Sequence, residues 1–108
     1  GRVPMSFYAQ LAAAARAGRL VSIRAKGGLP PRFATAAPQT QARFALFAGA
    51  ENRVFLPESQ KKTHAYLERH QPGRHSLTVL RGYGHADVFL GARAHIDVYP
   101  RVLAELNA

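Results

Sequence analysis

Residues 75–87 read HSLTVLRGYGHAD, a short apolar segment that runs directly into a glycine-rich loop carrying His85. The apolar content of His75 to Arg81 is typical of a strand, and the residues after the loop lead into a helical pattern. His85 therefore lies on a connection between a strand and a helix, where a rigid scaffold commonly presents catalytic side chains. The stretch predicts a strand followed by a loop that offers an imidazole.

A second apolar run, Arg43 to Gly49, ends in glycine and predicts a buried parallel strand. Between the two strands, Ser59 is expected to cap a helix that continues to about His70, and the Pro-Gly pair at 72–73 ends it. Two strands separated by a helix favour parallel pairing. The sequence therefore predicts an α/β fold.

Two further helices are expected at the ends of the chain. Ser6 can cap a helix over Phe7 to Ala17 that stops at Gly18. In a closing helix over about 92–106, Pro100 predicts a kink or a restart. The apolar residues that share one face of this closing helix are Ile96, Tyr99, Leu103 and Leu106.

The segment from Leu20 to Gln41 contains glycine and proline pairs and no sustained period, which predicts a connection. A connection of this length is unusual inside a compact domain and predicts packing against another part of a larger protein. Two strands alone cannot make a stable parallel sheet, because such sheets need both faces covered and several strands. We therefore expect the chain to be the terminal portion of a larger α/β domain.

Composition limits the classes of function. The chain has 108 residues, 15 Lys+Arg, six Asp+Glu and a formal charge of +9. Its basic residues are dispersed, which indicates a compositional bias rather than a specific nucleic-acid footprint. A small basic module that binds anionic polymers stays open as an alternative. The sequence contains no run of about eighteen apolar residues, so no transmembrane segment is predicted.

The absence of cysteine excludes disulfides and thiolate chemistry; it favours a reducing, cytoplasmic location but is compatible with any location. No cofactor is expected in this chain, because the glycine pair at 82 and 84 lacks the third glycine of a dinucleotide loop. Four histidines lack the spacing of metal ligands and are expected to be solvated at the surface. These are His64, His70, His75 and His95.

The pattern His85-x-Asp87 after a strand resembles the C-terminal end of α/β-hydrolases, in the acid-lipase-like branch. The segment 49–52, Gly-Ala-Glu-Asn, resembles the family's loop after the penultimate strand, where a Gly-x-x-Asp pattern carries the triad acid. The resemblance implies a C-terminal fragment of an α/β-hydrolase fold, with two parallel strands and flanking helices. Residues 1–42 would form a helix and a connection, and residues 43–108 the last two strand-helix units.

A narrower resemblance rests on four segments together: 49–52, 55–59, 82–87 and 97–100. In combination they look most like the hydrolase-like domain of long bacterial proteins that also carry a glucose-methanol-choline type flavin oxidoreductase, including cholesterol-oxidase-like ones. This similarity implies a lipid or sterol ester as substrate. It also implies that any flavin binds outside this chain.

The family pattern assigns roles to His85 and Asn52, and the neighbouring Glu51 and Asp87 have expected roles of their own. His85 matches the catalytic histidine, which acts as general base. Asn52 stands at the position of the acid, and an amide cannot stabilise imidazolium with a full negative charge. Glu51 is adjacent and could substitute if the loop turned it inward. Asp87 is expected to cap the following turn.

The nucleophile is expected outside the chain, because none of the four serines lies in a Gly-x-Ser-x-Gly elbow. The remainder of the hydrolase domain, in the same or another chain, is therefore the expected partner. Two interpretations follow. The chain is the C-terminal piece of a serine-type ester or lipid hydrolase, or it is a catalytically impaired hydrolase-like domain that serves a flavin-dependent oxidoreductase.

Overall fold

Two parallel strands form the centre of the C-terminal part of the chain. Strand β1 spans Ala45–Gly49 and strand β2 spans Ser76–Leu80, and they pair in parallel with Ala45 opposite Ser76 and Gly49 opposite Leu80. The computed structural model describes residues 3–23 and 28–108. The predicted parallel pairing of the two apolar runs is confirmed, and the fold class is mixed α/β.

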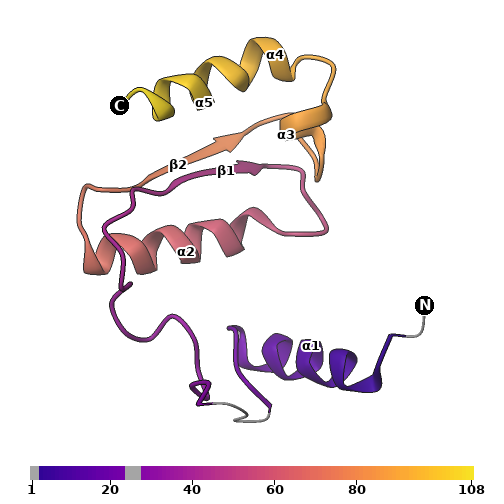
Figure 1. Ribbon diagram of the computed structural model, residues 1–108. Coiled ribbons are helices and arrows are strands. Elements are labelled where there is room, and N and C mark those ends of the chain that lie inside the picture. The colour runs from indigo at the N-terminus through magenta and orange to yellow at the C-terminus, as the bar shows by residue number, and fades with distance from the viewer. Residues whose placement is uncertain (1–2, 24–27) are drawn as a thin grey trace. The chain divides into compact units, whose positions relative to one another are not determined.

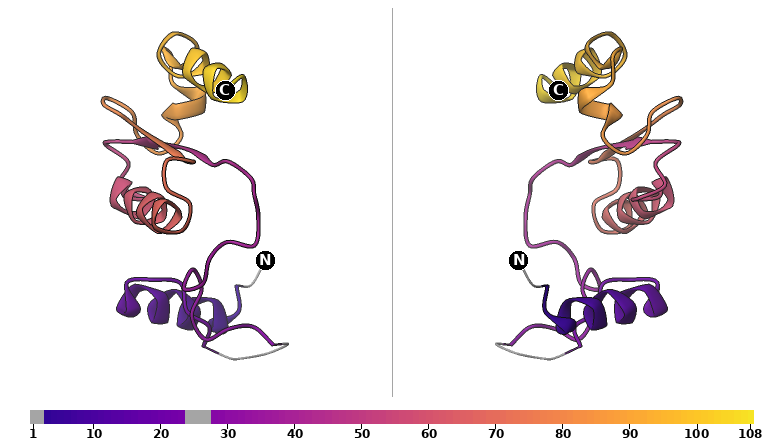
Figure 2. Two further views of the ribbon diagram at one scale, coloured as in Figure 1. Left: turned by 90° about the vertical axis from the view of Figure 1, so that its left-hand side faces the viewer. Right: turned by 90° about the vertical axis from the view of Figure 1, so that its right-hand side faces the viewer.

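Helices cover both faces of this small sheet (Figures 1 and 2). Helix α2, Pro57–His70, joins the strands and lies on one face. Helices α4, Ala94–Asp97, and α5, Tyr99–Leu106, lie on the other. The short helix α3, Asp87–Leu90, follows the loop at the carboxyl end of β2. This layering suits a parallel sheet, whose two faces both need apolar cover.

The core lies between the sheet and the C-terminal helices. Val98 is fully buried and packs in one cluster with Leu80, Tyr83, Val88 and Ala94. The buried row of the closing helices is therefore Ala94, Val98 and, partly, Val102, at helical spacing of four residues.

The apolar face that the sequence analysis identified in the closing helix is exposed to solvent. The chain is apolar on two adjacent sides of the helix, and the side with the smaller residues 94 and 98 meets the sheet. The exposed row retains 43% to 74% of its accessible surface and consists of Tyr99, Ile96, Leu103 and Leu106.

Helix boundaries follow proline and glycine more closely than the predicted serine caps. Helix α2 begins at Pro57, and the hydroxyl of Ser59, inside the helix, donates to the Leu56 carbonyl at 2.8 Å. Pro is favoured in the first helical turn because its missing N–H has no partner there in any case. The predicted restart near Pro100 is confirmed, since α4 ends at Asp97 and α5 begins at Tyr99.

The chain divides into two units, residues 1–39 and 40–108. In the first unit, helix α1 spans Met5–Ala17 with Pro4 at the cap position, so Ser6 lies inside the helix rather than capping it. Gly18 ends the helix with φ 59°, as predicted. The described part of residues 18–39 forms an irregular connection with a single antiparallel bridge between Val21 and Arg32. Among the described residues, no helix has both the length and the apolar character needed to cross a membrane.

Candidate functional site at the carboxyl edge of the sheet

The loops that follow β1 and β2 leave the same edge of the sheet and are hydrogen-bonded to each other. The Ala50 N–H donates to the Leu80 carbonyl at 2.8 Å, which extends the ladder by one step. The Glu51 N–H donates to the Tyr83 carbonyl at 3.1 Å. The two loops that contain the predicted site residues are therefore joined through their backbones. Ligand sites of open α/β sheets gather at this edge.

Gly49, the last residue of β1, is what allows the loops to approach so closely. A Cβ atom at this position would lie 2.3 Å from the Tyr83 carbonyl oxygen and 2.5 Å from that of Gly84. These atoms belong to backbone and cannot move aside without moving the loop that carries His85. The glycine at the end of this strand is thus a packing requirement of the candidate site.

Phe55 connects the two loops through side chains. Its ring lies against the His85 imidazole, with centroids 5.1 Å apart and planes inclined by 48°. Its backbone N–H donates to Asn52 Oδ1 at 2.9 Å, and the Val54 N–H donates to the same oxygen at 3.0 Å. The Asn52 oxygen therefore holds the loop that presents Phe55 to His85. The remaining polar group of the Asn52 side chain is its NH₂, which can only donate.

His85 and Glu51 are both exposed. Within residues 3–23 and 28–108, no hydrogen bond joins the His85 imidazole to Asn52 or Glu51. The structure brings the three predicted site residues to one edge and into two bonded loops, but it does not form the predicted relay between them. Their catalytic assignment stays a prediction.

The His85 loop is shaped by its neighbours in sequence. Gly82 adopts φ 78°, a conformation that favours glycine. Asp87 accepts a hydrogen bond from the Gly84 N–H at 2.6 Å, so its carboxylate closes the loop before it instead of capping the turn after it. Asp87 thus has a structural role, as expected, but its carboxylate bonds the preceding Gly84 and not the following turn. The hydrogen bond between Gly84 and Asp87 spans His85 and restrains the backbone on either side of it.

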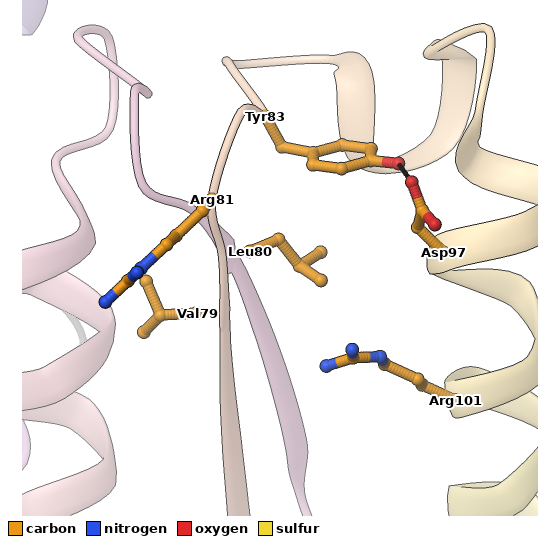
Figure 3. A pocket seen from close by; sticks show the side chains of 6 residues that line it. All are labelled: Val79, Leu80, Arg81, Tyr83, Asp97 and Arg101. Carbon is orange, nitrogen blue, oxygen red and sulfur yellow. Dashed lines mark hydrogen bonds between the residues drawn. The ribbon is translucent and has the colours of Figure 1, made fainter.

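Tyr83 anchors the same loop to the C-terminal helices. Its hydroxyl donates to Asp97 Oδ2 at 2.9 Å (Figure 3). Arg93 Nε donates to the same carboxylate at 3.2 Å. The hydrogen bond from Arg93, followed by that from Tyr83, holds the pKa of Asp97 below its usual value. Burial and the bond to Asp97 raise the pKa of Tyr83. Asp97, the centre of this clamp of Tyr83, Asp97 and Arg93, is therefore ionised near neutral pH, and its hydrogen bonds weaken as the pH falls through its lowered pKa.

An open cleft of about 340 Å³ lies beside this clamp, between β2 and the C-terminal helices (Figure 3). It contains none of the predicted site residues. Its lining residues are Val79, Leu80, Arg81, Tyr83, Asp97 and Arg101.

His75 is buried, not solvated, so that prediction is wrong for this histidine. Its exposed fraction is 8%, and its Nδ1 accepts the Phe44 N–H at 3.2 Å just before β1. The Glu68 carboxylate accepts the backbone N–H groups of Gly73 and His75 at 2.8 and 3.2 Å, and these two bonds lower the pKa of Glu68. His75 thus braces the start of both strands, far along the sheet from the carboxyl edge.

Sequence reasoning missed the clamp between Tyr83 and Asp97. Its residues lie in the segments GYGHAD and DVYP, which were interpreted for the His85 loop and for a family resemblance but not for a contact between them. In the structure the DVYP segment also has a packing role, because Val98 fills the core and the Tyr99 hydroxyl donates to the Phe89 carbonyl at 2.6 Å. The contact joins residues 14 positions apart across a loop and two helices, a separation at which local periodicity carries no signal.

No family model matches the chain, and the comparisons with curated proteins and with solved structures found no match. Within the described residues, no group of three or more His, Cys, Asp or Glu side chains is placed to hold a metal ion.

Proposed function

We propose that this chain supplies the histidine loop of an α/β-hydrolase-type centre that cleaves esters of lipids or sterols. One observation carries the proposal: two parallel strands deliver the loops of Asn52 and His85 to one edge, where Phe55 contacts the His85 ring at 5.1 Å and bonds Asn52. The resemblance of the His-x-Asp and Gly-Ala-Glu-Asn segments to the family supplies the chemistry.

In this proposal His85 takes the proton of a serine hydroxyl as that oxygen attacks the ester carbonyl carbon. The alcohol leaves with the same proton, and an acyl-enzyme remains. Water then attacks the acyl carbon, again with His85 as base, and the serine hydroxyl is restored with release of the acid. The serine comes from a segment outside these 108 residues.

The small size of the sheet supports the proposal that a segment outside these 108 residues pairs with it. The described residues contain only two strands in this sheet, and two-stranded sheets are marginal in water. The ladder bonds from Ser76 to Phe44 and from Ala50 to Leu80 assign residues 76, 78 and 80 of β2 to pairing with β1. The backbone groups of residues 45 and 47 of β1 then face the opposite edge, where a further parallel strand would complete the domain.

Asn52 favours a second candidate function. Its oxygen is already bonded to two backbone N–H groups, so only its NH₂ remains to face an imidazole. An NH₂ donating to Nδ1 fixes the proton on Nε2, and that tautomer cannot accept a proton from serine. The second candidate is thus a hydrolase-like domain with impaired catalysis that handles substrate for a flavin-dependent oxidoreductase.

The His85→Ala variant of the full-length protein tests the first function. We expect the turnover of a short-chain ester to fall about 10²-fold, the lower end for loss of a general base, because Asn52 already weakens this histidine. The matched control is His95→Ala, which removes an exposed imidazole from α4 and leaves turnover unchanged.

Equal rates for the native protein and His85→Ala overturn the catalytic role of His85. A native protein without ester turnover, but with an active Asn52→Asp variant, supports the second candidate. If neither form hydrolyses the ester, the first candidate is overturned, and Asn52 no longer explains the impaired catalysis of the second.

A further inference from the structure

The N-terminal 39 residues have an unusual balance of charge. They contain six of the basic residues and no acidic residue, whereas all six Asp and Glu lie between Glu51 and Glu105. The described basic residues of this unit, Arg16, Arg19 and Arg32, are exposed. Two thirds of the formal charge of +9 thus belongs to this one segment.

Helix α1 in the same segment carries apolar residues that are not covered. None of its 13 residues is buried, and Phe7, Tyr8 and Leu11 each expose about half of their surface, 49%, 52% and 52%. At 100° per residue these three side chains project within an arc of about 100°. The rings of Phe7 and Tyr8 meet edge to face, with centroids 5.6 Å apart. Met5, in the first turn, exposes 78%.

The other described residues of this unit leave that face open. The Gln10 amide donates to the Val21 carbonyl and accepts the Ile23 N–H at 3.3 Å, which ties the returning chain to the neighbouring side of α1. No described residue between 3 and 39 is buried, so this part of the unit has no core of its own. The returning chain is therefore hydrogen-bonded to one side of the helix, and the aromatic and aliphatic face on another side is exposed.

We propose that α1 binds the surface of anionic lipid bilayers, lying in the plane of the interface. An exposed apolar helix face in a segment that carries basic and no acidic residues matches the two components of such a surface, acyl chains and negatively charged headgroups. A nucleic-acid backbone would use the arginines but offers no apolar surface for Phe7 and Leu11. The 13-residue helix lies along the interface and does not cross it. The proposal uses no residue of the His85 loop and stands apart from the hydrolase proposal.

The test measures binding of the full-length protein to vesicles made of equal parts of phosphatidylcholine and phosphatidylserine. We expect Phe7→Ser/Leu11→Ser to weaken binding at least about tenfold, because it removes the apolar contact. We expect Arg16→Gln/Arg19→Gln to weaken it roughly fivefold per arginine, and salt to weaken it further. The matched control Lys61→Gln/Lys62→Gln removes two cations from α2 and leaves binding unchanged.

Several outcomes would overturn the proposal. Equal affinity for vesicles of phosphatidylcholine alone would remove the role of charge. Binding that is insensitive to Phe7→Ser/Leu11→Ser but is displaced by duplex DNA would assign the segment to nucleic acid. Loss of binding in Lys61→Gln/Lys62→Gln alone would place the contact on α2. Since the substituted residues of α1 are exposed, far-UV circular dichroism should show unchanged helix content in every variant.

Discussion

The Asn52→Asp variant of the full-length protein should hydrolyse a short-chain ester up to about 10⁴-fold faster than the native protein. The present Asn52 oxygen is occupied by the Val54 and Phe55 N–H groups. Aspartate can keep both bonds with one oxygen and offer the second oxygen to the His85 Nδ1–H. The proton then sits on Nδ1, and Nε2 is free to act as base.

The gain must depend on His85 if this explanation holds. Asn52→Asp should therefore give no gain in a His85→Ala background. Glu51→Gln, measured beside it, removes the other candidate acid without changing the Asn52 hydrogen bonds. A gain that survives removal of His85, or an Asn52→Asp variant no faster than the native protein, would contradict the proposed relay.

The Gly49→Ala variant is expected to destabilise the protein by about 3 kcal/mol or more, at the upper end for overpacking. The added methyl group would lie 2.3 Å and 2.5 Å from two backbone oxygens of the His85 loop. Neither oxygen can rotate away as a side chain would. The loops must separate, which breaks the bond from Glu51 to Tyr83 as well.

Urea unfolding of the two variants Gly49→Ala and Gly82→Ala separates this contact from simple backbone strain. Gly82 has φ 78° and nothing within 4 Å of its added Cβ, so its replacement costs only the left-handed conformation, about 1 to 2 kcal/mol. We expect Gly49→Ala to be the less stable of the two. Equal stability, or a greater loss in Gly82→Ala, would show that the loops do not meet as tightly as described.

The sequence was sufficient to predict the elements whose signals are local. The runs at 43–49 and 75–81 gave strands, Gly18 gave a helix stop, and Pro100 gave a restart. The parallel pairing followed from the helix between the strands. Each of these depends on a few adjacent residues or on connectivity, so tertiary contacts had little to override.

Features that depend on distant contacts were not predictable. The closing helix is apolar on two sides, and only packing on β2 selects Val98 over Leu103 for the core. His75 was expected at the surface because the histidines show no metal-ligand spacing, but the Phe44 N–H gives its Nδ1 a partner inside the fold. The position of Asn52 followed from the family pattern, whereas the use of its oxygen by two N–H groups depends on the fold of the loop.

Covalent labelling of the full-length protein with a fluorophosphonate, which reacts with activated serines, tests most directly whether His85 activates a nucleophile. The account predicts slow labelling of a single serine outside residues 1–108, faster labelling in Asn52→Asp, and loss of labelling in His85→Ala. Labelling at the same rate with and without His85, or no labelled serine in either the native protein or Asn52→Asp, would contradict it.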